Sequence, residues 1–264
     1  MDKKFRAGVV QFDIQKGRVR ANMDTAIAYL EKMAEDGVRL ALLPEMFSCS
    51  FDNKNLVRHA EASADVLGEL ASFAAEKKMI IAGSLPEIEG DSVYNVLAVI
   101  DETGNIAGRY RKTHLFRLTG EHRHFDSGSE IVVMDTSSGD IGLKLGLMIC
   151  YDLRFPELSR EMMLMDADII LVPAQWPTPR AGHWQTLLAA RAMENQLFVL
   201  SANRTGTEGG LVFPGLSMMV DPSGNVLADC GGNSGWAAAD IDLDQIRQAR
   251  ETIPCRTDRR TDIY

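Results

Sequence analysis

Short apolar runs alternate with amphipathic stretches along the 264-residue chain, and this alternation constrains the fold more than any other feature. The runs at 38–43 and 169–172 have the length of strands, and the first is apolar on both faces, as in a strand covered on each side. Elsewhere apolar residues recur at helical spacing, as at Met23, Ile27 and Leu30. This order predicts an α/β protein whose helices cover the faces of its sheets.

The other predicted elements follow the same alternation. Further strands are predicted at 7–12, 79–83, 93–100, 106–111, 131–134, 141–149 and 198–202, with two more turn-linked strands near the end. Further helices are predicted around 66–74, from Pro156, over 181–196 and as a short polar helix after the last strands. The turn sequence at 101–105 returns in similar form at 221–225, which suggests two similar halves.

No linker rich in Gly, Ser or Pro and no shift of composition divides the chain. We therefore expect a single domain over residues 1–264. The stretch 254–264 is polar, and we expect it to form a C-terminal arm that lies on the surface or on a partner subunit.

The charge balance bears on the partners of the protein. The chain has 37 acidic and 28 basic side chains, a net charge of −9, and no long basic stretch, so we expect neither nucleic acid nor a membrane surface as a partner. Its longest apolar runs are far shorter than the roughly 20 residues of a membrane span, and the start of the chain lacks the pattern of a signal peptide. With four cysteines and no C-x-x-C pair, we predict a cytoplasmic protein with reduced thiols.

Three reactive residues each follow a predicted strand. Glu45 comes after the strand 38–43 and one proline, Lys112 directly follows a strand, and Cys150 ends the predicted strand 141–149 ahead of a helix. Sites of α/β proteins form at the carboxyl ends of strands, and a nucleophile on a strand-to-helix turn exposes its side chain. Position alone is weak evidence, because a cysteine after an apolar strand is usually a small core residue.

The chemistry of the three residues is complementary. A thiol is mostly protonated at neutral pH, and a nearby cation such as Lys112 would lower its pKa and later stabilise a negatively charged oxygen. A base must take the thiol proton, and Glu45 suits this role if burial or a second carboxylate raises its pKa. The three residues together predict nucleophilic catalysis by Cys150.

Three segments around these residues, in this order, resemble the signature segments of the nitrilase superfamily of carbon–nitrogen hydrolases. The segments are Leu-Leu-Pro-Glu45-Met-Phe, Tyr-Arg-Lys112-Thr-His-Leu-Phe and Cys150-Tyr-Asp-Leu-Arg-Phe-Pro-Glu157, with weaker matches at 9–14 and 191–196. The resemblance implies a four-layer α-β-β-α sandwich. It also implies that Glu45 is the general base, Lys112 the oxyanion stabiliser and Cys150 the nucleophile.

A fourth catalytic member is implied by the same resemblance. The family pattern Gly-Glu-x-x-x-Phe-x-x-Gly matches Gly120 to Gly128, which assigns Glu121 as a second glutamate that orients Lys112. In the implied reaction the backbone N–H of Tyr151 helps to hold the oxyanion, ammonia leaves, and a thioester on Cys150 is hydrolysed by water. The substrate is a small amide, and no cofactor or metal is needed.

The substrate branch is indicated by residues outside these segments. Similarity around 114–124 and 175–185 is greatest to the ω-amidase branch, which hydrolyses the terminal amide of 2-oxo dicarboxylic monoamides such as 2-oxoglutaramate. Such a substrate carries a carboxylate that a cation should bind, and Arg117 and Arg180 are candidates. We expect Arg154 to pair with Asp152 instead, and Trp176 to be a wall of the pocket or a packing residue.

Other interpretations remain open at this stage. Neighbouring branches with the same catalytic residues act on nitriles, N-carbamyl compounds or deaminated glutathione, and some superfamily members have lost a catalytic residue and only bind or assemble. A metallohydrolase is a further alternative, since the segment 114–126 holds three histidines, Glu121 and Asp126. Relatives in the superfamily usually form homodimers, and we expect a homodimer or a larger homo-oligomer here.

Overall fold

The computed structural model describes residues 4–263 of the chain. The helices are α1 (Val19–Glu35), α2 (Leu56–Lys77), α3 (Pro156–Leu164), α4 (Ala181–Asn195) and α5 (Asp244–Thr252). Short 3₁₀ helices lie in the connections: η1 (Asn53–Asn55), η2 (Arg117–Thr119), η3 (Glu121–Arg123), η4 (Cys150–Arg154) and η5 (Thr178–Arg180). The strands are β1 (Lys4–Gln11), β2 (Leu40–Leu42), β3 (Ile80–Glu89), β4 (Ser92–Ile100), β5 (Ile106–Arg111), β6 (Val133–Ser138), β7 (Ile141–Leu147), β8 (Ile169–Ala174), β9 (Phe198–Asn203), β10 (Thr205–Glu208), β11 (Leu211–Pro214), β12 (Met218–Val220), β13 (Val226–Asp229) and β14 (Gly235–Asp242).

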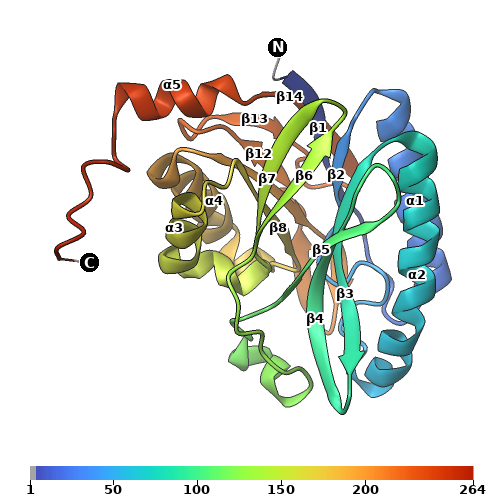
Figure 1. Cartoon of the computed structure of the whole chain (residues 1–264). Coiled ribbons are helices and arrows are strands. Elements are labelled where there is room, and N and C mark those ends of the chain that lie inside the picture. Colours follow the sequence, from blue (N-terminus) through green and yellow to red (C-terminus); the bar gives the residue numbers. More distant parts are fainter. Residues whose placement is uncertain (1–3, 264) are drawn as a thin grey trace.

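The strands form two six-stranded sheets and one small hairpin, β10–β11. The first large sheet has the order β14-β1-β2-β3-β4-β5 and the second has the order β13-β12-β9-β8-β7-β6. Figure 1 shows the two sheets between two helical layers, with α1 and α2 outside the first sheet and α3 and α4 outside the second. The prediction of a four-layer α-β-β-α sandwich is confirmed.

Helix α1 buries the apolar stripe that its sequence predicts, apart from Ile27, which is only partly buried. Met23, Ala26, Leu30 and Met33 of α1 are all buried against the outer face of the first sheet. Because side chains three and four residues apart lie on one face of a helix, these four residues form a continuous contact surface. The central core lies between the two sheets and contains the inward-facing residues of both.

The centre of each large sheet is parallel, and this positions the site. β1, β2 and β3 run parallel in the first sheet, as do β7, β8 and β9 in the second. The carboxyl ends of parallel strands meet at one edge of a sheet, where the connecting loops converge. Residues that follow β2, β7 and β8 are therefore brought together, although they are distant along the chain.

Some predicted boundaries in the first three quarters of the chain were wrong, most of them by a few residues. The largest differences are that the strand predicted at 79–83 runs on to Glu89 and that the helix predicted around 66–74 begins at Leu56. The strand predicted at 38–43 is only Leu40–Leu42, and the strand predicted at 141–149 ends at Leu147. The strand predicted at 131–134 is β6, which runs on through the polar residues Asp135 to Ser138 because it is an edge strand that pairs only with β7. Apolar runs extend into the loops that bury the site, so hydrophobicity alone places the ends of β2 and β7 too late, whereas it places the end of β6 too early.

The part of the chain after residue 202 differs more from the prediction. Two strands were predicted after 202, whereas β10 to β14 lie there. β10 and β11 are four-residue strands that pair only with each other, and β14 is rich in alanine, so they lack the longer apolar or alternating pattern that predicts a strand. β14 pairs with β1 over eight residues and so joins the end of the chain to its start.

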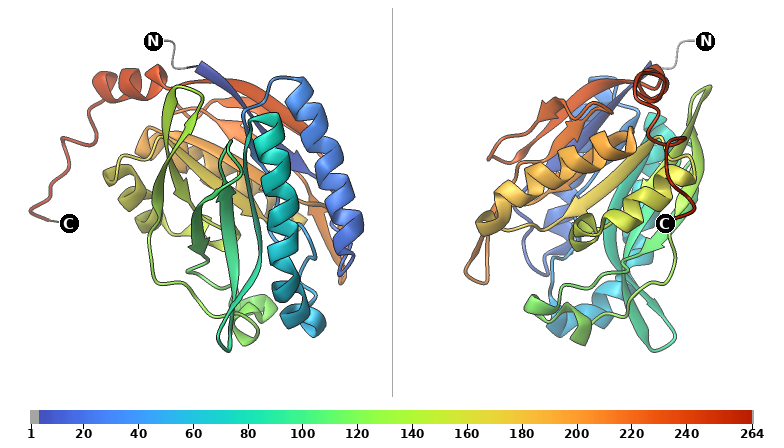
Figure 2. Two further views of the ribbon diagram at one scale, coloured as in Figure 1. Left: turned by 45° about the vertical axis from the view of Figure 1, so that its right-hand side comes forward. Right: turned by 90° about the vertical axis from the view of Figure 1, so that its left-hand side faces the viewer.

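The C-terminal arm is described up to residue 263, and Tyr264 lies outside the described residues. Figure 2 shows that the chain leaves the body of the molecule after α5. Arg256 of the arm forms an ion pair with Asp166 and donates a hydrogen bond to the carbonyl oxygen of Leu164, at the end of α3. Among residues 4–263, no helix combines the length and hydrophobicity needed to cross a membrane.

Candidate active site

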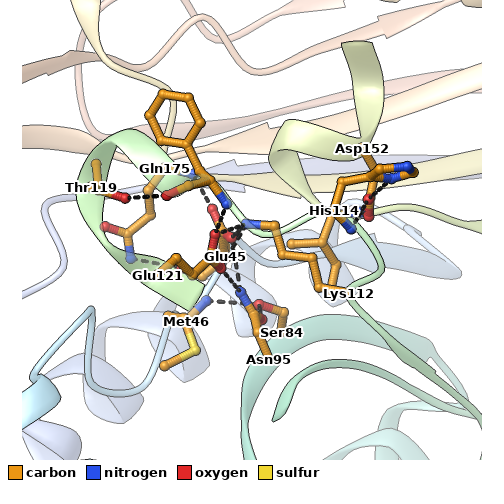
Figure 3. A network of polar contacts seen from close by, with 12 residues as sticks. Glu45, Met46, Ser84, Asn95, Lys112, His114, Thr119, Glu121, Asp152 and Gln175 are labelled. Atoms are coloured by element: carbon orange, nitrogen blue, oxygen red, sulfur yellow. Dashed lines mark hydrogen bonds and ion pairs between the residues drawn. The ribbon is translucent and has the colours of Figure 1, made fainter. Parts of the chain in front are cut away.

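A buried cluster of three charged side chains occupies the edge where the loops meet (Figure 3). The Nζ atom of Lys112 lies 2.8 Å from Oε1 of Glu45, and 2.9 and 3.0 Å from the two carboxylate oxygens of Glu121. Glu45 follows β2, Lys112 follows β5, and Glu121 opens η3. The structure thus brings together three of the predicted site residues, with one cation between two carboxylates.

The cluster shifts the proton affinities of its own members. Burial raises the pKa of Glu45 and Glu121 adds to this effect, which outweighs the opposing influence of the Lys112 ammonium. Burial would lower the pKa of Lys112, but the carboxylates of Glu121 and Glu45 outweigh it and hold that pKa well above its ordinary value. Lys112 therefore stays charged, while Glu45 has the raised pKa that a general base near neutral pH requires.

Cys150 lies on a tight turn beside this cluster. It opens η4 with a φ of 48°, a left-handed conformation that is strained for a residue with a side chain. Burial and the Glu45 carboxylate raise the pKa of its thiol well above the ordinary value, against the opposing effects of Lys112 and the backbone N–H of Gln175. The thiol is therefore protonated at rest: Lys112 lowers its pKa as expected, but burial and Glu45 outweigh that effect. A base is needed to activate it.

Asp152 connects the turn at Cys150 to the segment around Lys112 through hydrogen bonds. Its buried carboxylate accepts hydrogen bonds from the side chains of Tyr110 and His114, both at 2.8 Å, and from the backbone N–H of Ile149 at 2.9 Å. The expected Arg154–Asp152 pair is wrong, because these partners already occupy both oxygens of Asp152. The guanidinium of Arg154 instead lies 4.7 Å from the centre of the Trp176 ring.

The pattern from Gly120 to Gly128 has a physical reason at each defined position, and at Gly120 it is a φ of 78°, which favours glycine. The Glu121 carboxylate binds Lys112 and also accepts the backbone N–H of Phe116 at 2.7 Å, which fixes the loop. Phe125 is buried in a small apolar cluster below that loop. A side chain at Gly128 would collide with the carbonyl oxygen of Arg111, so the chain can return past the lysine only with glycine there.

Sequence reasoning missed two residues that contact Glu45. The side-chain Nδ2 of Asn95 donates to Oε1 of Glu45 at 2.9 Å, and the backbone N–H of Gln175 donates to Oε2 at 2.8 Å. Asn95 is fully buried in the otherwise apolar run Val93 to Ile100, and a polar residue in such a run is a signal that could have been used. Gln175 follows β8 just as Glu45 follows β2, so its position after a parallel strand was the available signal.

The three residues expected near the substrate, Trp176, Arg180 and Arg117, differ in their burial and in their contacts. Trp176 is buried and packs on Trp184, with its indole N–H donating to the carbonyl oxygen of Arg180 at 2.8 Å. The guanidinium of Arg180 lies 5.6 Å from the centre of the Phe116 ring, which in turn contacts the ring of Tyr151 next to Cys150. The guanidinium of Arg180 is therefore connected to the cysteine turn through the rings of Phe116 and Tyr151. The side chain of Arg117, on η2, is exposed instead.

The histidine-containing segment does not gather into a metal-binding group. Within residues 4–263, no three His, Cys, Asp or Glu side chains are grouped so that they could hold a metal ion. His114 is bonded to Asp152, and Glu121 faces Lys112. His122 and His124 line an open depression of about 650 Å³ on the other side of η3. The geometry of these donors does not support the metallohydrolase alternative.

The fold and the buried cluster define a class of enzyme. The family model described as carbon-nitrogen hydrolase matches residues 6–251, and the chain belongs to this family. It is therefore a hydrolase that acts on carbon–nitrogen bonds other than peptide bonds, as predicted.

Individual relatives cover almost the whole chain. It is 37% identical to a 2-oxoglutaramate amidase of Bacillus subtilis (strain 168) over 263 residues, which cover 99% of this chain and 100% of the relative. A carbon-nitrogen hydrolase from Helicobacter pylori G27 has a TM-score of 0.93 at 26% identity, and the match covers 100% of this chain and 97% of that one. An amidase from Nesterenkonia sp. AN1, with a TM-score of 0.86 at 27% identity and coverage of 99% and 95%, has been solved with the acetamide moiety of fluoroacetamide added covalently at its active site cysteine.

Proposed function

We propose that this protein is an ω-amidase that hydrolyses the terminal amide of small 2-oxo dicarboxylic monoamides, with Cys150 as nucleophile. The observation that carries the reaction type is the buried Lys112 ammonium, 2.8 Å from Glu45 and 2.9 Å from Glu121, beside the thiol of Cys150. The substrate class is supported by the likeness, over the whole chain, to the 2-oxoglutaramate amidase of Bacillus subtilis.

The first half of the proposed reaction forms a thioester. Glu45 takes the proton of the Cys150 thiol as the sulfur attacks the amide carbon, and the carbonyl electron pair moves onto oxygen. Lys112 and the backbone N–H of Tyr151 stabilise this oxyanion. The two contacts of Lys112 with Glu121 are to one carboxylate and can share a single N–H, which leaves another for the oxyanion. When the tetrahedral intermediate collapses, ammonia leaves with the proton that Glu45 held.

The second half releases the acid. Glu45, again unprotonated, takes a proton from water as the water oxygen attacks the thioester carbon. The carbon–sulfur bond breaks and the proton returns to sulfur, so that free thiol and carboxylic acid result. Glu121 keeps Lys112 in place throughout and does not exchange a proton with the substrate.

The substrate class is tested by the rate of ammonia release from a panel of compounds. We expect 2-oxoglutaramate to react faster than benzonitrile or N-carbamyl-alanine, by on the order of 10² or more in kcat/KM, because its terminal amide and its carboxylate are both recognised. The measurement is steady-state kinetics with each compound on the same enzyme preparation. A higher kcat/KM for the nitrile or the carbamyl compound would assign the protein to another branch of the family.

Arg180 is the proposed partner of the substrate carboxylate. Within residues 4–263 its guanidinium forms no ion pair, and its ring contact with Phe116 leads to the cysteine turn. We expect Arg180→Leu to raise KM for 2-oxoglutaramate by about 10- to 100-fold, the value of a charge-assisted hydrogen bond, with little change for an uncharged amide such as butyramide. Arg117→Leu is the matched control on the exposed η2, and a larger effect there would give the role to Arg117.

We also propose that the protein works in the cytoplasm as a homodimer or larger homo-oligomer. The resemblance to the superfamily supports the assembly, and the arm that leaves the body after α5 offers a contact surface (Figure 2). Sedimentation of the purified protein as a monomer at micromolar concentration would contradict it.

A further inference from the structure

Asn95 has an unusual setting for a buried amide. It lies in β4, and its side chain points into the space between the two sheets together with those of Leu97 and Val99, which have the same parity along the strand. Asn95 has no exposed surface. A buried amide without hydrogen bonds is costly, so each of its polar atoms needs a partner.

The partners of Asn95 fix which way its amide points. Its Oδ1 accepts the hydroxyl of Ser84 at 2.8 Å, and the Ser84 hydroxyl itself accepts the backbone N–H of Met46 at 2.9 Å. Because the hydroxyl proton is used toward Asn95, Oδ1 must lie on that side. The Nδ2 group is therefore directed at the carboxylates, 2.9 Å from Oε1 of Glu45 and 3.5 Å from Oε1 of Glu121 (Figure 3).

The two carboxylate oxygens of Glu45 consequently differ in the number of hydrogen bonds that they accept. Oε1 accepts hydrogen bonds from both Lys112 at 2.8 Å and Asn95 at 2.9 Å, so its acceptor sites are filled. Among the described residues, Oε2 accepts only the backbone N–H of Gln175, at 2.8 Å, and keeps one site for a proton. The backbone of Asn95 also accepts the N–H of Lys112 at 2.9 Å, so one residue holds both partners of this ion pair.

We propose that Asn95 is a positioning residue for the base: it commits Oε1 of Glu45 to the Lys112 ion pair and so leaves Oε2 as the oxygen that takes the thiol proton. This inference rests on the proposed function of Glu45 as general base. In this role its side-chain amide acts through Glu45, and its backbone carbonyl oxygen holds the backbone N–H of Lys112.

Loss of the Asn95 amide should change how the carboxylate titrates. A donor to a carboxylate favours its charged form, so without this donor the pKa of Glu45 rises further. In Asn95→Leu we expect kcat to fall by about 10- to 100-fold with KM within about threefold, and the acid limb of the kcat profile to move up by about one pH unit. Rates are corrected for the fraction of active enzyme by titration of the ammonia burst.

Two controls separate positioning from general damage. Asn22→Leu removes another buried asparagine with three hydrogen bonds, all to backbone groups, and should cost stability without moving the acid limb. Ser84→Ala keeps the Asn95 amide but frees its orientation, and should move the limb in the same direction by a smaller amount. If Asn95→Leu does not fold, Ser84→Ala still tests the inference by the same measurement.

An acid limb that stays at its wild-type position in both Asn95→Leu and Ser84→Ala would overturn the inference. The proposed function has a separate test in Glu45→Gln, which should remove turnover in either case. If Glu45→Gln is inactive and the Asn95 and Ser84 variants keep the wild-type limb, only the role of Asn95 fails. If Glu45→Gln keeps its activity, the proposed function fails as well.

Discussion

Cys150→Ser should fold normally and lose turnover, with kcat lower by on the order of 10⁴ or more. The side chain keeps its shape, so the free energy of unfolding should change by about 1 kcal/mol or less. Its alcohol, however, is a much weaker nucleophile than sulfur, and Glu45 cannot deprotonate it far enough to compensate. The measurements are ammonia release from 2-oxoglutaramate and urea unfolding followed by circular dichroism.

Cys230→Ser is the matched control for this variant. Cys230 is also half-buried, packs against the same core between the sheets, and has a pKa raised by burial to about 12. It follows β13, however, which three strands separate from β7, the strand that leads to Cys150. It should keep wild-type turnover. If Cys150→Ser retained most of the activity, or if Cys230→Ser lost it, Cys150 would not be the nucleophile.

Lys112→Met should impair both stability and catalysis. The variant leaves Glu45 and Glu121, both buried, without the cation that lies between them. Breaking a buried pair in this way costs about 3–5 kcal/mol in the free energy of unfolding, since uncompensated charge remains inside. The oxyanion also loses its stabiliser, so we expect kcat to fall by at least about 10²- to 10³-fold in whatever protein remains folded.

The stability loss of Lys112→Met should depend on pH in a defined direction. Without the cation, burial and the neighbouring Glu121 carboxylate raise the pKa of Glu45 in the folded state further above its unfolded value. The folded state then binds protons more tightly, so the loss is large at about pH 7 and shrinks toward about pH 5. Lys77→Met, which removes surface ion pairs with Glu31 and Glu76, is the control and should cost less than about 1 kcal/mol at either pH. Equal losses for the two variants would contradict the account of the cluster.

Much of the fold was predictable because its core elements are strongly periodic. The apolar strands at 38–43 and 169–172 and the amphipathic helix α1 carry their pattern in the sequence, and all are present. The repeated turn is also present: Asp101 and Asp221 each cap a hairpin, β4–β5 in one sheet and β12–β13 in the other, by accepting the backbone N–H groups of the residues two and four further on. Of the strands after 202, the pair β12–β13 around the repeated turn was predictable, whereas β10, β11 and β14 were not, since their partners rather than their own side chains define them.

The residues of the site also divide into those that the sequence identifies and those whose roles only the structure reveals. Glu45, Lys112 and Cys150 could be recognised because they follow strands, have matched chemistry and stand in segments that resemble the signature segments of the nitrilase superfamily. Asn95 and Asp152 could not be given their roles, because each acts through partners that only the folded chain brings near, such as Ser84 and Tyr110. The direction of the pKa shift at Cys150 could not be predicted from the sequence either. It depends on whether burial and Glu45, which raise the pKa, outweigh Lys112, which lowers it.

The central claim is that Cys150 carries the acyl group of the substrate between the two halves of the reaction. Rapid mixing of enzyme with 2-oxoglutaramate, acid quench and peptide mass spectrometry test it most directly. The account predicts a transient adduct on the peptide that contains Cys150, with the mass of the substrate less that of ammonia, formed as fast as the first ammonia is released. Release of ammonia at full rate with no adduct on that peptide, or with the adduct on another residue, would contradict it.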